Sequence, residues 1–208
     1  MDYQCYHKSH PRKRSDRLRT VKEPDVRKQE ILDGAIKVFA RKGYDKTTTT
    51  DIAKELQISQ GLCYRYFPTK EAIYDAALEK YADMIAQENM RKTDLDIPIR
   101  ELINHITDRM DRLTSAEKKD QDLYELFHSE NSHRMHDELF LRVARKIIPY
   151  VQEHLKRAKE KGEIHIEDTD GAAIVGIYGW VGLCLTKNLT DEERMLKMRN
   201  AWYQLLGL

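Results

Sequence analysis

Residues 31–75 read ILDGAIKVFARKGYDKTTTTDIAKELQISQGLCYRYFPTKEAIYD, and this stretch decides the fold. Its first part carries apolar residues at i, i+4, i+7 and i+8, the spacing of one face of a helix: Ile31, Ala35, Val38 and Phe39. Gly43 follows as a helix stop signal. An amphipathic helix is therefore expected from about Val26 to just before Gly43.

Two short helices should follow the first one. Thr48 and Asp51 form a short-armed capping box, which predicts a helix start at this point. Ser59 is a second cap, and residues 60–67 should form a third helix that ends at Pro68. Two short helices joined by a turn of a few residues must cross steeply, which is the arrangement of a helix-turn-helix.

The second helix of a helix-turn-helix lies in the major groove, with base edges at its N-terminal residues and phosphates at its flanks. Gln60 can pair a donor and an acceptor with a base edge, and Gly61 lets the backbone come close to DNA. Cys63 and Phe67 should face the core, while Lys70 adds charge at the start of the next helix. The candidate DNA-binding residues here are Ser59, Gln60, Gly61, Leu62, Tyr64, Arg65, Tyr66 and Lys70.

Composition fits a helical protein. The 208 residues are 40% apolar and 34% charged, with 5 Pro and 9 Gly, which is typical of a soluble all-α chain. Three scattered cysteines favour neither a disulfide framework nor a cysteine zinc site. The N-terminus has no apolar stretch of the kind a secretory signal needs, so a cytoplasmic location is expected.

Charge is distributed unevenly along the chain. Residues 1–22 hold 7 basic and 2 acidic side chains and few large apolar ones. Such a segment cannot build a core, so residues 1–25 are interpreted as a mobile basic arm. Either a solvated tail or an arm that reaches DNA is consistent with this composition.

The N-terminal part resembles the DNA-binding head of the TetR family of bacterial transcriptional regulators. The matching runs are 31–44, 47–53, 58–67 and 70–73. The resemblance implies an all-helical homodimer that mostly represses transcription and releases an operator when a small ligand binds its C-terminal domain.

The same resemblance implies individual roles in DNA binding. Thr48 and Thr50 would approach the DNA backbone. Gln60, Leu62 and Tyr66 would face bases, and Tyr64 and Lys70 would hold phosphates. The alternative is a helical ligand-binding or enzymatic protein whose N-terminal helices only pack.

The expected architecture is all-α with about nine helices: a three-helix head on a C-terminal helical domain. The arm would cover 1–25, the helix-turn-helix domain 26–70, and the ligand-binding and dimerisation domain 71–208. Within the last of these, Pro149 should kink a long helix.

Residues 171–186 carry no charge on any face, so this helix must be covered on all sides. We expect one side to pack inward and the other on a second subunit; a fully internal helix of a monomer is the alternative. The expected dimer interface comprises Gly176, Gly179, Gly182 and Trp202. The run is too short to span a membrane.

A pocket for a small apolar or aromatic effector would draw on Met84, Met110, Tyr124, Phe127, His128, Tyr178 and Trp180. The same residues at helical spacing are equally typical of an ordinary core. His128, His133 and His136 lie close in sequence, but we expect exposed histidines and no metal. Because no catalytic motif occurs, neither enzymatic activity nor a cofactor is expected.

Overall fold

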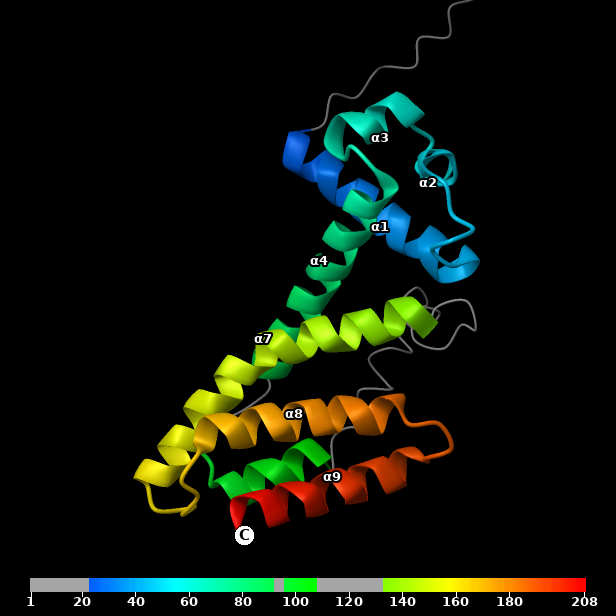
Figure 1. The fold of residues 1–208 in the computed structure, drawn as a ribbon. Helices are drawn as coiled ribbons and strands as arrows, with labels where there is room; N and C mark the ends of the chain where they lie inside the picture. Colours follow the sequence, from blue (N-terminus) through cyan, green and yellow to red (C-terminus); the bar gives the residue numbers. More distant parts are fainter. Residues whose placement is uncertain (1–22, 92–95, 108–132) are drawn as a thin grey trace, which may run out of the picture.

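The computed structural model describes residues 23–91, 96–107 and 133–208, and all regular secondary structure in these ranges is helical (Figure 1). The helices are α1 Pro24–Lys42, α2 Thr49–Glu55, α3 Gln60–Tyr66, α4 Lys70–Arg91, α7 His133–Glu160, α8 Thr169–Leu185 and α9 Asp191–Leu206. A further helical segment covers residues 99–107. The all-α prediction is confirmed, with eight helices in the described ranges against about nine expected. The basic arm at residues 1–22 lies outside those ranges.

The predicted helix ends are confirmed in the head. Gly43 ends α1 with φ 77°, a backbone conformation that side chains other than glycine rarely adopt. Thr48 caps α2 in a complete capping box with Asp51. The Ser59 hydroxyl accepts a hydrogen bond from the Leu62 amide at 3.2 Å and so caps α3. Local hydrogen bonds therefore fix where both short helices begin.

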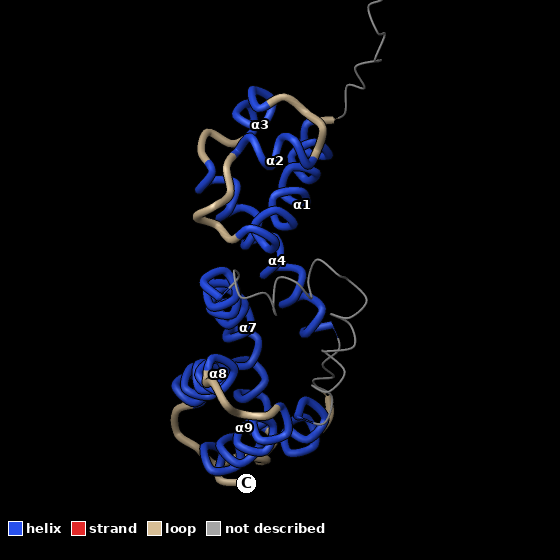
Figure 2. The backbone as a smooth tube through the Cα atoms, turned by 90° about the vertical axis from the view of Figure 1, so that its right-hand side faces the viewer, coloured by secondary structure: helices blue, strands red, loops and turns tan. Residues whose placement is uncertain are grey.

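The core of the head extends beyond the three-helix motif. Fully buried side chains of α1, α2 and α4 form one cluster, including Phe39, Ile52 and Leu78. Met135 and Leu139 of α7 belong to the same cluster. Figures 1 and 2 show α4 running out of the head and α7 lying beside it. The head is thus packed directly on the first half of α7.

An ion-pair ladder fixes α4 against α7. Arg142 pairs with Asp75 at 2.8 Å and with Glu79 at 3.2 Å. Lys146 pairs with Glu79 at 2.5 Å and with Asp83 at 2.6 Å. The partners recur every four residues on both helices, so one register satisfies both basic side chains at once.

A second core occupies the far end of the molecule. Leu155 and Ala158 of α7, Ala173 of α8, and Met198 and Leu206 of α9 bury their side chains there. Helices α8 and α9 run antiparallel across this end (Figure 1). Pro149 lies inside α7 between the parts that belong to the two cores, and α7 bends along its length.

Gly176 and Trp202 pack against each other within this second core. A Cβ at Gly176 would lie 2.2 Å from the Trp202 ring, and that ring is only 8% exposed. These two residues, expected at a dimer interface, contact each other within one chain: α8 needs a glycine here because α9 of the same chain approaches closely.

Candidate nucleic-acid interface

The N-terminal half of α3 is open to solvent. Gln60 and Gly61 are exposed, and no atom lies within 4 Å of the position a Cβ on Gly61 would take. One turn later Tyr64 is 47% exposed and Arg65 is exposed. Cys63 and Phe67 point into the head, as expected from their spacing. This face offers an amide, a phenol and a guanidinium to a DNA groove.

Leu62 and Tyr66 lie sideways on α3. Both are half-buried, and Tyr66 packs against the core of the head. The resemblance places both at bases, but most of the Tyr66 ring is occupied by internal packing. Only the part of each side chain that stays exposed is free to contact DNA.

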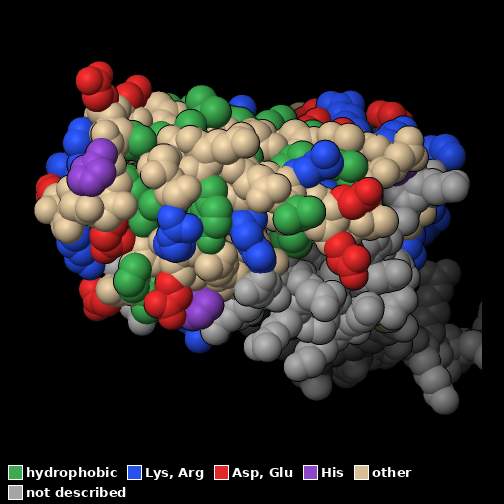
Figure 3. Space-filling model, turned by 90° about the horizontal axis from the view of Figure 1, so that it is seen from below, with side chains coloured by type: hydrophobic (Ala, Val, Ile, Leu, Met, Phe, Trp, Pro, Cys, Tyr) green, Lys and Arg blue, Asp and Glu red, His purple; other side chains and the backbone are tan. Residues whose placement is uncertain are grey.

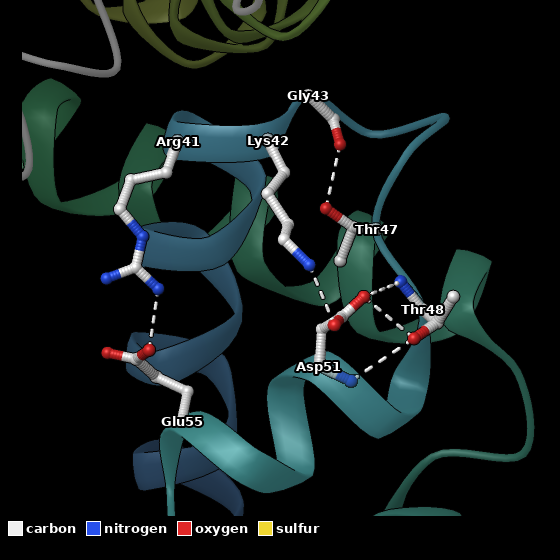
Figure 4. Close-up of polar contacts among 7 residues, drawn as sticks. All are labelled: Arg41, Lys42, Gly43, Thr47, Thr48, Asp51 and Glu55. Carbon is white, nitrogen blue, oxygen red and sulfur yellow. Dashed lines mark hydrogen bonds and ion pairs between the residues drawn. The ribbon is translucent and has the colours of Figure 1, made fainter.

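Thr48 and Asp51 hold each other at the start of α2 (Figure 4). The Asp51 carboxylate accepts hydrogen bonds from the Thr48 hydroxyl at 2.8 Å and from the Thr48 amide at 2.9 Å. The Asp51 amide donates back to the same hydroxyl at 3.2 Å. Because a threonine has one hydroxyl proton, a phosphate contact by this group would have to compete with Asp51.

Two ion pairs fasten α2 to the end of α1 (Figure 4). Lys42 Nζ lies 2.7 Å from Asp51, and Arg41 lies 2.6 Å from Glu55. The hydrogen bond with Lys42, followed by those with Thr48, lowers the pKa of Asp51 well below its ordinary value. The start of α2, where half-buried Thr50 also lies, is therefore rigidly attached to α1.

The turn between α2 and α3 is tight. Gln57 has φ 53°, in the left-handed region, and its amide donates to Lys54 O at 3.1 Å. The preceding residue, Leu56, packs so close to α1 that a Cβ on Gly34 would lie 2.6 Å from it. These contacts set the steep crossing of α2 and α3.

Lys70 bends back onto the loop between α1 and α2. Its ammonium donates to the Tyr44 carbonyl at 3.0 Å and lies 4.1 Å from the centre of the Tyr44 ring. The sequence predicts that Lys70 contacts a DNA phosphate, but it does not predict the contact of Lys70 with Tyr44. Tyr44 lies 26 positions before Lys70 in the chain, and no local sequence pattern indicates that these two residues are in contact.

Three of the residues predicted to bind the effector do not share one pocket in the structure. Met84 is exposed on α4, and Tyr178 is 39% exposed on α8. Trp180 is half-buried against the second core. Met110, Tyr124, Phe127 and His128 lie outside the described residues. The described part therefore holds only fragments of the expected pocket.

The described residues contain neither a metal-binding cluster nor a membrane-spanning helix. No group of three His, Cys, Asp or Glu side chains there is placed to hold a metal ion. His136 instead lies 3.3 Å from Asp137 and against the Phe140 ring. No helix in these ranges has the length and apolar character of a membrane span.

Comparisons with known proteins agree on one family. Residues 31–77 match the family model described as bacterial regulatory proteins, tetR family. The chain is 37% identical over 101 residues to the HTH-type transcriptional regulator LuxR of Vibrio harveyi, covering 49% of each protein. It is also 37% identical over 73 residues to IcaR of Staphylococcus aureus, a negative regulator of the biofilm operon icaADBC, covering 34% of this chain and 39% of IcaR. The chain thus spans half or less of the length of these relatives.

Solved structures share the fold over most of the chain. Salmonella enterica GusR superposes with a TM-score of 0.61 at 19% identity, covering 90% of this chain and 99% of GusR. Bacillus subtilis FadR, solved in complex with stearoyl-CoA, superposes with a TM-score of 0.57 at 19% identity, covering 86% and 97%. The likeness therefore extends beyond the head to the helices that carry it.

Proposed function

Because residues 31–77 form a helix-turn-helix DNA-binding domain of the TetR family of bacterial regulators, we propose that the whole chain is a ligand-responsive transcriptional repressor. It would bind a nearly palindromic operator as a homodimer and leave it when a small organic molecule binds the C-terminal helices. It would act in the cytoplasm, where the DNA is, and without catalysis.

The exposed face of α3 carries this proposal. Gln60, Gly61, Tyr64 and Arg65 are exposed on a helix whose other side is anchored by Cys63, and α2 is fixed to α1 behind it. A rigid, exposed helix of this kind can enter a major groove without rearranging the head. Gln60, at its first position, is the residue we assign to a base edge.

Helix α8 supports a second copy of the chain as partner. Ile174, Val175 and Tyr178 are 43%, 61% and 39% exposed, and nothing lies within 4 Å of a Cβ on Gly179 or Gly182. These positions follow one another along a single uncharged face. An apolar helix face of this length is typical of an interface. Tyr178 therefore moves from the proposed pocket to the proposed dimer surface.

The face of the molecule seen in Figure 3 differs from the exposed face of α8 in the kind of side chains it carries. On that face hydrophobic side chains lie among Lys, Arg, Asp and Glu side chains rather than forming one continuous patch. The contrast favours the uncharged face of α8, rather than the face seen in Figure 3, as the main contact between subunits. A two-fold axis beside α8 would place both α3 helices on the same DNA, which predicts two related half-sites.

The effector is proposed to be apolar or aromatic with few polar groups. Half-buried Trp180 and the apolar second core support this class. FadR, which shares the fold, was solved with stearoyl-CoA, and the long acyl chain of that ligand is consistent with an effector that has an apolar part.

Selection from a random duplex pool tests the proposal. The purified chain should enrich a sequence with two inverted half-sites, and binding to that duplex should weaken steeply as salt increases, because phosphate contacts release counterions. Equal binding to selected and unselected duplexes would contradict an operator-binding repressor and favour a helical protein whose head only packs.

A further inference from the structure

Tyr44 contacts the first two residues of α4 in three ways. Its hydroxyl donates to Glu71 Oε1 at 2.8 Å. Its carbonyl accepts from Lys70 Nζ at 3.0 Å, and its ring lies 4.1 Å from the same ammonium. Contacts from one tyrosine in the α1–α2 loop thus converge on the start of α4, directly after α3.

The ring of Tyr44 is itself held firmly. Its centre lies 4.5 Å from that of Tyr74 and 5.7 Å from that of Phe39, both buried in the core of the head. Burial, together with the hydrogen bond to Glu71, raises the pKa of Tyr44 to about 12. The hydroxyl therefore keeps its proton near neutral pH and remains a donor to Glu71.

The first turn of α7 reaches the same tyrosine. The Arg134 guanidinium lies 5.4 Å from the centre of the Tyr44 ring. Its neighbour Met135 is only 3% exposed and belongs to the core of the head. Arg134, Met135 and the loop around Tyr44 line one hollow of about 120 Å³. Two cations from different helices therefore share one aromatic ring.

We propose that Tyr44 is a positioning residue for DNA binding, which holds Lys70 at the start of α4 and is linked through Arg134 to α7. This inference rests on the proposed function of the head. A lysine ammonium has three N–H donors, and the Tyr44 carbonyl uses one, so the others can reach a phosphate from a fixed position. Fixing a long side chain before binding removes part of the entropy lost on binding.

A double-mutant cycle tests the first part, with the duplex selected by the wild-type chain as probe. Lys70→Gln and Tyr44→Leu should each weaken binding roughly three- to tenfold and lower the salt slope by about one. The double variant should bind no more weakly than Lys70→Gln alone. The backbone carbonyl of residue 44 is present in every variant, whereas only Tyr44→Phe keeps the ring beside the ammonium, so Tyr44→Phe should retain most of the affinity and the salt slope.

Thermal unfolding separates positioning from a merely structural role. Tyr44→Leu should lower the unfolding temperature because it removes the ring that packs on Phe39 and Tyr74, whereas Lys70→Gln should lower it much less and still weaken DNA binding. Additive losses of DNA affinity in the cycle would overturn the inference, and so would a Lys70→Gln variant with normal binding. If the wild-type chain selects no duplex, the proposed function itself fails, and the inference with it.

A matched pair of arginines tests the link to α7. Arg134 and Arg157 are both exposed on α7 and both pair with a glutamate one turn away, but only Arg134 lies over Tyr44. Arg134→Gln should weaken DNA binding roughly two- to fivefold, and only when Tyr44 is present. Arg157→Gln should leave binding unchanged. Equal effects of the two substitutions would refute the link.

Discussion

Replacing His154 by leucine should stabilise the protein. His154 lies on α7 and is 5% exposed, and neither ring nitrogen has a hydrogen-bond partner. A buried polar group without a partner costs about 1–3 kcal/mol. Leucine fills a similar volume without a polar atom, so His154→Leu should raise the free energy of unfolding by about 1–3 kcal/mol and the unfolding temperature by roughly 2–12 °C.

The gain should grow as the pH falls. Burial is the largest cause that keeps the pKa of His154 below its ordinary 6.5; the charges of Lys161 and Arg157 act in the same direction, and that of Glu163 acts against it. Below pH 6.5 the unfolded chain binds a proton on His154 that the folded chain does not. The wild type should therefore lose stability through this group from about pH 6.5 down to its folded pKa, by up to about 1.4 kcal/mol per pH unit. Above that window the contribution is constant.

Urea unfolding at pH 7.5, 6.5 and 5.5 measures this effect. All samples need one protein concentration, because the measured stability would depend on it if the proposed dimer forms. Exposed His165, five residues beyond the end of α7 in the following loop, serves as control, and His165→Gln should reproduce the wild-type pH profile. A His154→Leu variant that is less stable at pH 7.5, or that loses stability below pH 6.5 as the wild type does, would refute the reasoning.

Four further substitutions test other parts of the structure. Gly179→Leu should abolish the dimer in sedimentation velocity without lowering the free energy of unfolding of the monomer, and a variant that remains a dimer contradicts the proposed interface. Gly176→Leu should instead prevent folding, because its side chain would collide with the Trp202 ring. Gln57→Gly should stabilise the head by about 1 kcal/mol in urea unfolding, since the residue has φ 53°, and a loss of stability would show that its side chain matters more than its backbone. Gln60→Ala should reduce discrimination between selected and random duplexes by about 1–3 kcal/mol, and an equal loss of affinity on both would remove it from the base edge.

What the sequence predicted well is local. The capping box of Thr48 with Asp51 and the cap of Ser59 on Leu62 each join residues three positions apart, so their spacing alone identifies the helix starts. The contact between Lys70 and Tyr44 spans 26 positions, and that between Arg142 and Asp75 spans 67. No periodicity in the chain encodes such pairs, because they form only after the helices pack.

The orientation of α8 could not be read from its residues either. An uncharged helix has no polar face, so the pattern gives no direction for the core. The structure turns Gly176 toward α9 and leaves Gly179 and Gly182 open, although all three had been assigned to the same interface. For the same reason Tyr178, expected in a pocket, lies on the exposed side.

Helix α7 contributes to both cores and so connects the C-terminal helices to the head. Met135 and Leu139, before Pro149, pack with the head and α4, whereas Leu155 and Ala158, after it, pack with α8 and α9. Proline removes one backbone hydrogen bond and so weakens the helix where the two packing groups meet. A rearrangement of the second core that bends α7 would therefore move its first half, and with it α4 and the Tyr44 loop, as one packed body. The head would follow α7 as well as α4, because both helices contribute side chains to its core.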